Sequence, residues 1–134
     1  MNEIQFRPIT PDDIPLIGTY ILAEPSHKEK MDSRFYTELP ANSVSYAVDD
    51  DEGTVAFVRQ DSLPGNTMRL HTDFVPDSKE RIAAAISMAY PMIALDAYAK
   101  GFDRIVFESE SVPLIAFMLR MGFRAQLIHE LPTA

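Results

Sequence analysis

The sequence contains no cysteine and only three histidines among its 134 residues. The lack of cysteine excludes a thiol nucleophile, a thiolate zinc site, an iron–sulfur cluster and disulfide bonds. With so few histidines we also expect no metal site. The first ten residues mix charged and apolar side chains, unlike a signal peptide, and we find no apolar run of about 18 residues that would span a membrane. These features predict a cytoplasmic protein.

Basic residues are scarce, with 12 Lys and Arg against 20 Asp and Glu and a formal net charge of -8. Nucleic acid and anionic membranes repel an acidic protein, so we expect neither as a partner. Residues 1–68 carry 5 basic and 12 acidic side chains, and residues 69–134 carry 7 and 8. A cationic ligand would therefore prefer the first half. The alternative is an acidic surface that serves solubility.

Hydrophobic residues make up 46% of the chain, enough for one folded domain over residues 1–134. Hydrophobic periodicity predicts strands that alternate with helices. The expected strands are 4–9, 44–48, 54–60, 68–75, 104–108 and 123–129, and the expected helices are 11–23, 27–39, 79–100 and 112–121. This order predicts an α/β protein with a mixed central sheet of about six strands and helices on both faces.

Two elements carry further expectations. The helix over 79–100 is nearly apolar all round, which predicts burial against a sheet, a left-handed cap at Gly101 and a kink or break caused by Pro91. In the strand over 68–75, alternation places His71 and Asp73 on one face. We expect the four acids at 49–52 to lie in the turn of a hairpin, because their spacing does not match a calcium loop.

The order of these elements, together with three short motifs, resembles the GCN5-related N-acetyltransferases (GNAT, the acyl-CoA N-acyltransferase fold). The opening strand and helix at 4–14 are similar to the start of that family. Val75-Pro76, Lys79 and Gly101-Phe102 are spaced like its acyl-CoA segment, and 113–123 is similar to its final helix with a Gly-Phe ending. The resemblance covers nearly the whole chain. It implies acetyl-CoA as co-substrate and an amine of a small molecule or peptide as acceptor.

The resemblance also implies where acetyl-CoA binds. The family pattern is Arg or Gln, two residues, Gly, one residue, then Gly or Ala, and it places the diphosphate at the start of the long helix. Here the pattern falls on Lys79, Arg81, Ile82, Ala83 and Ala84, with Ile82 in place of the first glycine and Glu80 beside it. Backbone N–H groups of Phe74 and Val75 would polarise the thioester carbonyl if their strand bulges as the family's strand does.

The family commonly takes its general base from the strand before the long helix. His71 is our first candidate, because histidine titrates near neutral pH, and Asp73 is the second. The family often supplies a tyrosine as proton donor from the last helix. Met118 stands at that position and cannot donate a proton. The acid would then come from another group or from water.

The combined prediction is transfer of an acetyl group from acetyl-CoA to an amine, by direct attack and without a covalent enzyme intermediate. The acidic first half favours a cationic amine. The alternative is a GNAT-fold binding or protein-interaction module that has lost catalysis. An enzyme needs an open wedge between the strands at 68–75 and 104–108, which Ile82 or Glu80 would fill in a module. Val106 and Phe107 are candidates for contacts in a homodimer.

Overall fold

The computed structural model describes residues 3–24, 31–76, 78–107 and 112–123. Its elements are β1 (Gln5–Arg7), a 3-10 turn (Pro11–Asp13), α1 (Ile14–Ala23), α2 (Arg34–Thr37), β2 (Ser43–Asp50), β3 (Gly53–Leu63), β4 (Thr67–Phe74), α3 (Lys79–Ala99), β5 (Arg104–Phe107) and α4 (Val112–Arg120). The strands form one sheet in the order β1-β2-β3-β4-β5. The first four are antiparallel, and β5 runs parallel to β4.

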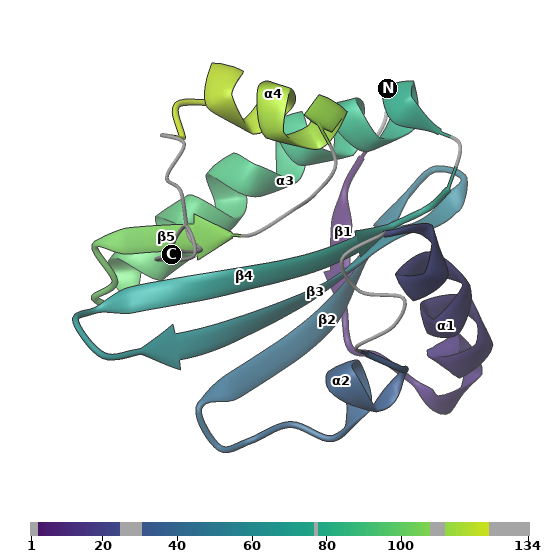
Figure 1. Ribbon diagram of the computed structural model, residues 1–134, viewed down its shortest axis with the longest axis horizontal. Helices are drawn as coiled ribbons and strands as arrows, with labels where there is room; N and C mark the ends of the chain where they lie inside the picture. Colours follow the sequence, from purple (N-terminus) through teal and green to yellow (C-terminus); the bar gives the residue numbers. More distant parts are fainter. Residues whose placement is uncertain (1–2, 25–30, 77, 108–111, 124–134) are drawn as a thin grey trace, which may run out of the picture.

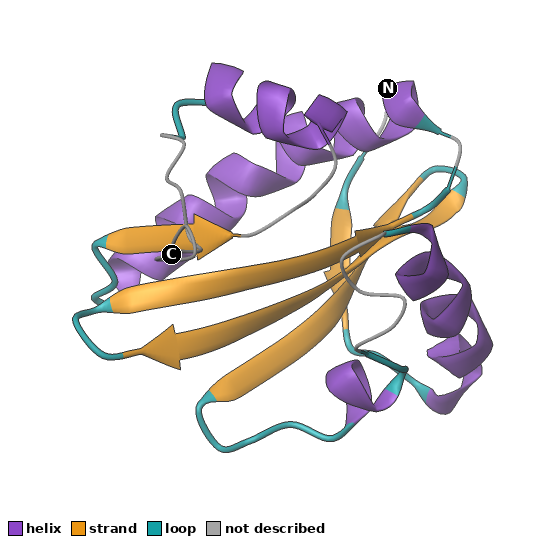
Figure 2. Cartoon of the chain, in the orientation of Figure 1, coloured by secondary structure: helices purple, strands orange, loops and turns teal. Residues whose placement is uncertain are grey.

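The mixed sheet and the α/β architecture are confirmed, with five strands in the described residues rather than about six. The expected strand at 123–129 lies outside those residues beyond Phe123. Helices cover both faces of the sheet, as Figures 1 and 2 show: α3 and α4 lie over one face, and α1 and α2 over the other.

Each face of the sheet has its own core. The α3 side is filled by Val48, Val55, Ala56, Val58, Met68, Leu70, Ala85, Ala89, Ile93 and Ala97. The other side is filled by Ile17, Tyr20, Ile21, Tyr36, Ala47 and Phe57. In β4 the alternation agrees with the sequence pattern, because Met68 and Leu70 face α3 while His71 and Asp73 face α2.

The second hairpin differs from the expectation. The strand expected over 54–60 is longer in the structure, because β3 continues to Leu63 and the turn is confined to 64–66. Gly65 has φ +79° and Asn66 has φ +52°, which are conformations that glycine and asparagine tolerate. Asp61 therefore belongs to the strand. Its side chain is buried there, and its carboxylate accepts hydrogen bonds from Ser43 and Arg59.

The long helix ends where the sequence predicts. Gly101 has φ +93°, and the N–H groups of Gly101 and Phe102 donate to the carbonyls of Tyr98 and Ala97, each at 3.0 Å. This is a Schellman cap. The expectation of a break at Pro91 is wrong, because α3 runs through it without interruption. Pro91 is exposed, so the carbonyl that loses its donor can bond to water.

The predicted burial of α3 against the sheet is confirmed, although only one side of this nearly apolar helix is buried. The residues that face the sheet are small or aliphatic: Ala85, Ile86, Ala89, Ile93 and Ala97. The opposite side exposes Met88, Met92, Leu95 and Tyr98. By length and composition α3 is apolar enough to cross a membrane, contrary to our reading of the sequence. The core helix of a folded domain passes the same test, and α3 packs on the sheet.

The first helix begins as the sequence predicts. Pro11 opens the turn, and the Thr10 N–H donates to the Asp13 carboxylate at 2.8 Å. Arg7 connects this turn to the sheet through two bonds to Asp13, at 2.8 and 2.9 Å, and one to Asp49 at 2.7 Å. The hydrogen bond from Arg7 is the main reason why the pKa of Asp13 is lowered.

The helix expected over 27–39 is much shorter in the structure. Only α2, a single turn, is formed, and residues 25–30 lie outside the described part of the chain. Its Phe35 and Tyr36 side chains turn toward the sheet, where they meet β3 and β4. The turn therefore has a specific role, which is to bring two aromatic side chains over the polar residues of these strands.

Candidate functional site

The pairing of β4 with β5 is short. It runs from Thr67–Arg104 to Leu70–Phe107, while β4 itself continues to Phe74. Residues 71–74 pair with β3 on one side, but on the side of β5 they pair with no strand of the described residues. We call this side of residues 71–74 the open edge of β4. This edge is the place where the sequence analysis expects a wedge.

Backbone donors point toward the open edge. The Val75 N–H donates to the Val55 carbonyl at 2.9 Å, so these residues form a hydrogen-bonded pair of the β3–β4 ladder. Such pairs alternate with non-bonded ones, which directs the backbone groups of Thr72 and Phe74 away from β3. Both strands are fully described, and their register shows no bulge. The Val75 N–H is thus committed to Val55, and only the Phe74 N–H faces the place where a thioester would lie.

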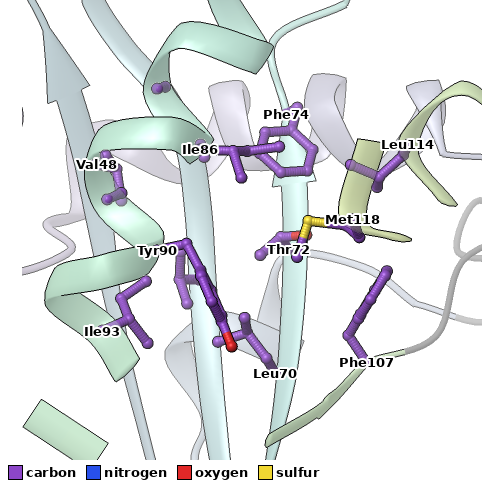
Figure 3. Close-up of a pocket in the computed structure, with 14 residues that line it drawn as sticks. Val48, Leu70, Thr72, Phe74, Ile86, Tyr90, Ile93, Phe107, Leu114 and Met118 are labelled. Carbon is purple, nitrogen blue, oxygen red and sulfur yellow. The ribbon is translucent and has the colours of Figure 1, made fainter. Parts of the chain in front are cut away.

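An apolar pocket adjoins the open edge on the α3 side (Figure 3). Its volume, taken as the space that the centres of water molecules can occupy, is about 50 Å³. Its lining residues are Val48, Ala56, Val58, Leu70, Thr72, Phe74, Ala85, Ile86, Ala89, Tyr90, Ile93, Phe107, Leu114 and Met118. In Figure 3, side chains of α3 face those of α4 and β5 across β4. Among the described residues that line the pocket, neither Ile82 nor Glu80 is present.

On the opposite face, His71 belongs to a buried polar cluster around Asp61, which is only 2% exposed. The Asp61 carboxylate accepts from Ser43 Oγ at 2.5 Å and from Arg59 Nε at 2.8 Å. Its Oδ2 atom lies 3.1 Å from His71 Nε2 and 3.3 Å from the guanidinium of Arg69. Arg69 Nε is buried and has no hydrogen-bond partner among the described residues. The cluster thus holds one carboxylate against two guanidinium groups.

These contacts determine the charge of Asp61. Burial acts to raise its pKa, but the hydrogen bonds from Ser43 and Arg59 and the charge of Arg59 outweigh burial and lower the pKa of Asp61 to about 2. Asp61 is therefore ionised at neutral pH and acts only as an acceptor.

The state of His71 follows from its surroundings. Burial lowers its pKa below the ordinary value of 6.5, although Asp61 opposes the shift, so the ring is neutral at pH 7. Because Asp61 only accepts, His71 donates from Nε2, and the lone pair remains on Nδ1. The Phe35 ring lies edge-on to the imidazole at 4.8 Å and stacks against the Arg59 guanidinium at 4.1 Å. His71 is therefore oriented as a base whose acceptor atom is Nδ1.

Asp73 has a different setting. It is fully buried, and its carboxylate accepts a short hydrogen bond from the Tyr36 hydroxyl, which is also buried. Burial is the main cause that raises the pKa of Tyr36 well above its ordinary value. Asp73 is thus out of reach of a substrate in this structure, and its visible role is to hold α2 against β4.

The start of α3 presents the residues expected to bind acetyl-CoA. Ile82 N–H makes the first helical bond, to the Ser78 carbonyl at 2.9 Å, so the N–H groups of 79–81 lie before the helical ladder. In the described residues the Ser78 hydroxyl does not cap them and donates to Pro76 instead. Lys79 is exposed beside these donors. Uncapped donors, the helix dipole and an ammonium group together fit an anion such as a diphosphate.

Arg81 is turned away from this position. Its guanidinium binds Asp50 through two bonds, at 2.7 and 2.8 Å, and contacts the Gly53 carbonyl at 3.3 Å. Arg81 therefore fastens α3 to the β2–β3 hairpin. Ala83 is half-buried and Ala84 is exposed. Of the five residues predicted here, Lys79 is the one whose charged group is placed to meet an anion.

Phe107 and Val106 lie on opposite faces of β5. Phe107 lines the pocket and packs against Phe123, with ring centroids 5.0 Å apart, so its side chain belongs to the core. Val106 pairs with Arg69 and shares its face. A homodimer contact through this strand stays a prediction, and Val106 is the residue that would carry it.

Sequence reasoning missed the other members of the cluster around His71 and Asp61. They are Asp61 itself, Arg59, Ser43, Arg69 and Phe35. A signal for the first two exists. If the turn is confined to 64–66, the two strands pair symmetrically about it and place Arg59 opposite His71 and Asp61 opposite Arg69, as observed. No comparable signal marks Phe35 or Ser43, because their positions depend on how α2 and β2 pack.

Solved structures of acetyltransferases share this architecture. A GNAT-family acetyltransferase from Staphylococcus aureus has a TM-score of 0.69 and 16% identity, over 97% of this chain and 90% of that one. The GNAT domain of PAT from S. lividans has a TM-score of 0.67 and 20% identity, over 95% of this chain and 85% of that one. An aminoglycoside acetyltransferase from an uncultured soil sample has a TM-score of 0.60 and 15% identity, over 100% of this chain and 99% of that one.

The sequence itself matches no family model and no curated protein. The chain has the GNAT fold, as its sequence resemblance predicts. Identities of this size show the fold alone, so the function must be argued from the site.

Proposed function

We propose that the protein is an acyl-CoA-dependent N-acyltransferase, which transfers an acetyl group from acetyl-CoA to the amine of a small molecule or a peptide. The observation that carries this proposal is the His71–Asp61 pair. It presents an oriented neutral base on β4, beside the open edge toward which the Phe74 backbone points. The GNAT fold supports the same assignment.

In this proposal His71 removes the proton that the attacking amine must lose. The amine nitrogen bonds to the thioester carbonyl carbon while Nδ1 of His71 takes the proton, and the anionic Asp61 stabilises the imidazolium that results. Acetyl-CoA supplies the acyl group on a thiolate leaving group, which departs as its C–S bond breaks and is protonated by water. The Phe74 N–H would donate to the carbonyl oxygen as negative charge develops on it.

The diphosphate of acetyl-CoA would bind at the start of α3. Lys79 and the N–H groups of the first helical turn are the groups proposed to hold it. Ile82 in place of a glycine and the charge of Glu80 both act against tight binding. We therefore expect an affinity that depends strongly on Lys79 and on salt.

The acceptor is proposed as a primary amine without a requirement for further positive charge. In the sequence analysis, the excess of acidic residues over 1–68 was the reason to expect a cationic amine as acceptor. In the structure, Asp13 and Asp49 are paired with Arg7, and Asp50 is paired with Arg81. Arg7 is already included in the count for the first half, so of the two arginines only Arg81 reduces the excess. The three carboxylates nevertheless have arginine partners, so they are less available to a cationic acceptor than the charge count alone suggests.

A specific observation favours the second candidate function, a binding or interaction module without catalysis. Met118 is buried in the pocket lining, where the resemblance implies a proton-donating tyrosine. A module could keep the pocket and the fold while it lacks the acid. The oriented His71–Asp61 pair, which a module would not need, is the reason that we rank the enzyme first.

Two measurements on the purified chain test the proposal. Calorimetric titration with acetyl-CoA at low salt should show saturable binding that Lys79→Glu abolishes and that Lys100→Glu, at the far end of α3, leaves unchanged. Mass spectrometry should then detect acetylated product in a panel of small amines and peptide amines. Binding without product in any of them would favour the module, and no binding at all would overturn the proposed function.

A further inference from the structure

The pocket beside β4 extends well beyond the open edge. Its lining residues near that edge are Thr72, Phe74, Phe107, Leu114 and Met118. Leu70 of β4 and Tyr90 of α3 also line the pocket. The remaining residues belong to β2, β3 and the sheet-facing side of α3, and we call this part the inner pocket: Val48, Ala56, Val58, Ala85, Ile86, Ala89 and Ile93. The space therefore continues under α3 across the sheet, away from the position of a thioester.

Small side chains create the inner pocket. Ala56 of β3 faces Ala85 and Ala89 of α3, and all three alanines are buried, at 3%, 3% and 7% exposed. Larger residues at these positions would fill the gap between helix and sheet, as interiors are normally close-packed. The three alanines therefore leave space between α3 and the sheet at this place.

The chemistry of the lining favours an apolar ligand. Among the described residues around the pocket, only Thr72 and Tyr90 carry a side-chain hydroxyl, and every other lining side chain is hydrocarbon or thioether. A buried water molecule needs two to four polar partners, and apolar cavities without them stay dry and bind apolar molecules. The inner pocket offers no such set of partners, so it suits a hydrocarbon chain better than water.

The pocket and the open edge are continuous. Leu70 and Phe107, the last β4–β5 pair, both line the pocket, and Thr72 and Phe74 continue the lining along β4. Figure 3 shows these β4 side chains between α3 and α4. A carbonyl held at the Phe74 N–H would thus have an apolar path leading under α3.

We propose that the inner pocket binds a short aliphatic chain, and that this chain is the acyl group of the donor. The whole pocket, of which the inner pocket is one part, has a volume of about 50 Å³, which holds roughly four water-sized groups. That size fits a butyryl or hexanoyl chain and exceeds the needs of acetyl. The assignment of the chain to a donor rests on the proposed function, whereas the affinity of the pocket for an aliphatic chain does not.

The test compares acetyl-, butyryl- and hexanoyl-CoA by calorimetry on the full chain, with 1-hexanol as a probe that lacks CoA. Each methylene that enters the pocket should tighten Kd by about fourfold. Butyryl-CoA should therefore bind at least tenfold more tightly than acetyl-CoA. Hexanol should bind too, as followed by chemical-shift changes of the Ala85 and Ala89 methyl groups.

Two variants fill the pocket from opposite walls. Ala89→Leu projects from α3 and Ala56→Val from β3, and either should abolish hexanol binding and the preference for longer chains. Ala99→Leu makes the same change as Ala89→Leu on an exposed position of α3 and should leave both unchanged. Circular dichroism confirms that each variant is folded. Ala56→Val provides the smaller change should Ala89→Leu fail to fold.

The outcomes separate the two proposals. Acetyl-CoA binding with no gain from longer chains, and no hexanol binding, overturns the pocket proposal and leaves the proposed function intact. Hexanol binding that Ala89→Leu abolishes, with no binding of any CoA ester, supports the aliphatic site and overturns both its assignment to a donor and the proposed function. A chain-length preference that persists in both filled variants also overturns the pocket proposal.

Discussion

The Nε2 atom of His71 lies 3.1 Å from Oδ2 of Asp61, its diagonal neighbour across the β3–β4 pair. This contact fixes which ring nitrogen carries the proton, because an ionised Asp61 can only accept. The lone pair on Nδ1 is the chemical feature on which the proposed transfer depends.

The pH dependence of transfer should report on His71. Its pKa lies below 6.5 because of burial, so kcat/KM should rise with pH and reach half its plateau below pH 6.5. In Asp61→Asn the opposing charge is gone, so the pKa of His71 should fall further and the midpoint should move to lower pH. A midpoint near pH 8 in the unsubstituted chain would point to a different base.

Asp61 should make the folded state sensitive to acid. Its pKa is about 2 in the folded chain and 3.8 ordinarily, which corresponds to about 2 kcal/mol of stability at neutral pH. Because the folded pKa is the lower one, this stability is present above pH 4 and is lost as the pH falls from about 4 to 2. Urea unfolding should show a deficit for Asp61→Asn at pH 7 that shrinks over this range, while Asp32→Asn, on the surface, shows none.

Arg7 should contribute more to the free energy of unfolding than an exposed arginine does. It binds Asp13, Asp49 and Thr54 and joins β1 to β2 and to the first helical turn. Arg7→Met should lower the free energy of unfolding by about 1–3 kcal/mol. The matched control is Arg34→Met, whose ion pair with Asp32 is exposed and should not change stability measurably. Equal effects of the two substitutions in urea unfolding would contradict this account.

Tyr36 should affect stability more than chemistry. Its hydroxyl donates to the buried carboxylate of Asp73, and its removal in Tyr36→Phe should cost about 1–3 kcal/mol of unfolding free energy. If Asp73 only positions α2, kcat at a temperature where the variant is folded should change little compared with His71→Gln. A loss of kcat as large as that of His71→Gln, with the pH profile altered, would assign Asp73 a direct part in the reaction.

Much of the fold could be predicted from local patterns. The alternation in β4 and the glycine at 101 each depend on neighbouring residues, and both predictions are confirmed. The outer side of α3 could not be predicted, because an apolar surface looks the same in sequence whether another element covers it or not. Met92 and Leu95 belong to this outer side, and both are exposed. The prediction of a break at Pro91 was wrong because the residue faces solvent, where the carbonyl that loses its donor can bond to water.

The site was predictable only in part. His71 was identified from its strand and its titration range, but its partner Asp61 lies beyond the end of the strand expected over 54–60, so the two were not expected to meet. The burial of Asp61 depends on Arg59 and on Ser43 of β2, which meet it only through the sheet register. The inner pocket had no sequence signal, because Ala56 and Ala89 reveal a gap only when β3 and α3 face each other.

The most direct test of the account is a comparison of the unsubstituted chain with His71→Gln in an assay that measures acylated amine and released CoA together. We predict that the unsubstituted chain forms both in equal amounts. The variant should bind acetyl-CoA with unchanged affinity and turn over at least about a hundredfold more slowly. Unchanged turnover in the variant, or no acylated amine from the unsubstituted chain despite saturating acetyl-CoA, would contradict the account.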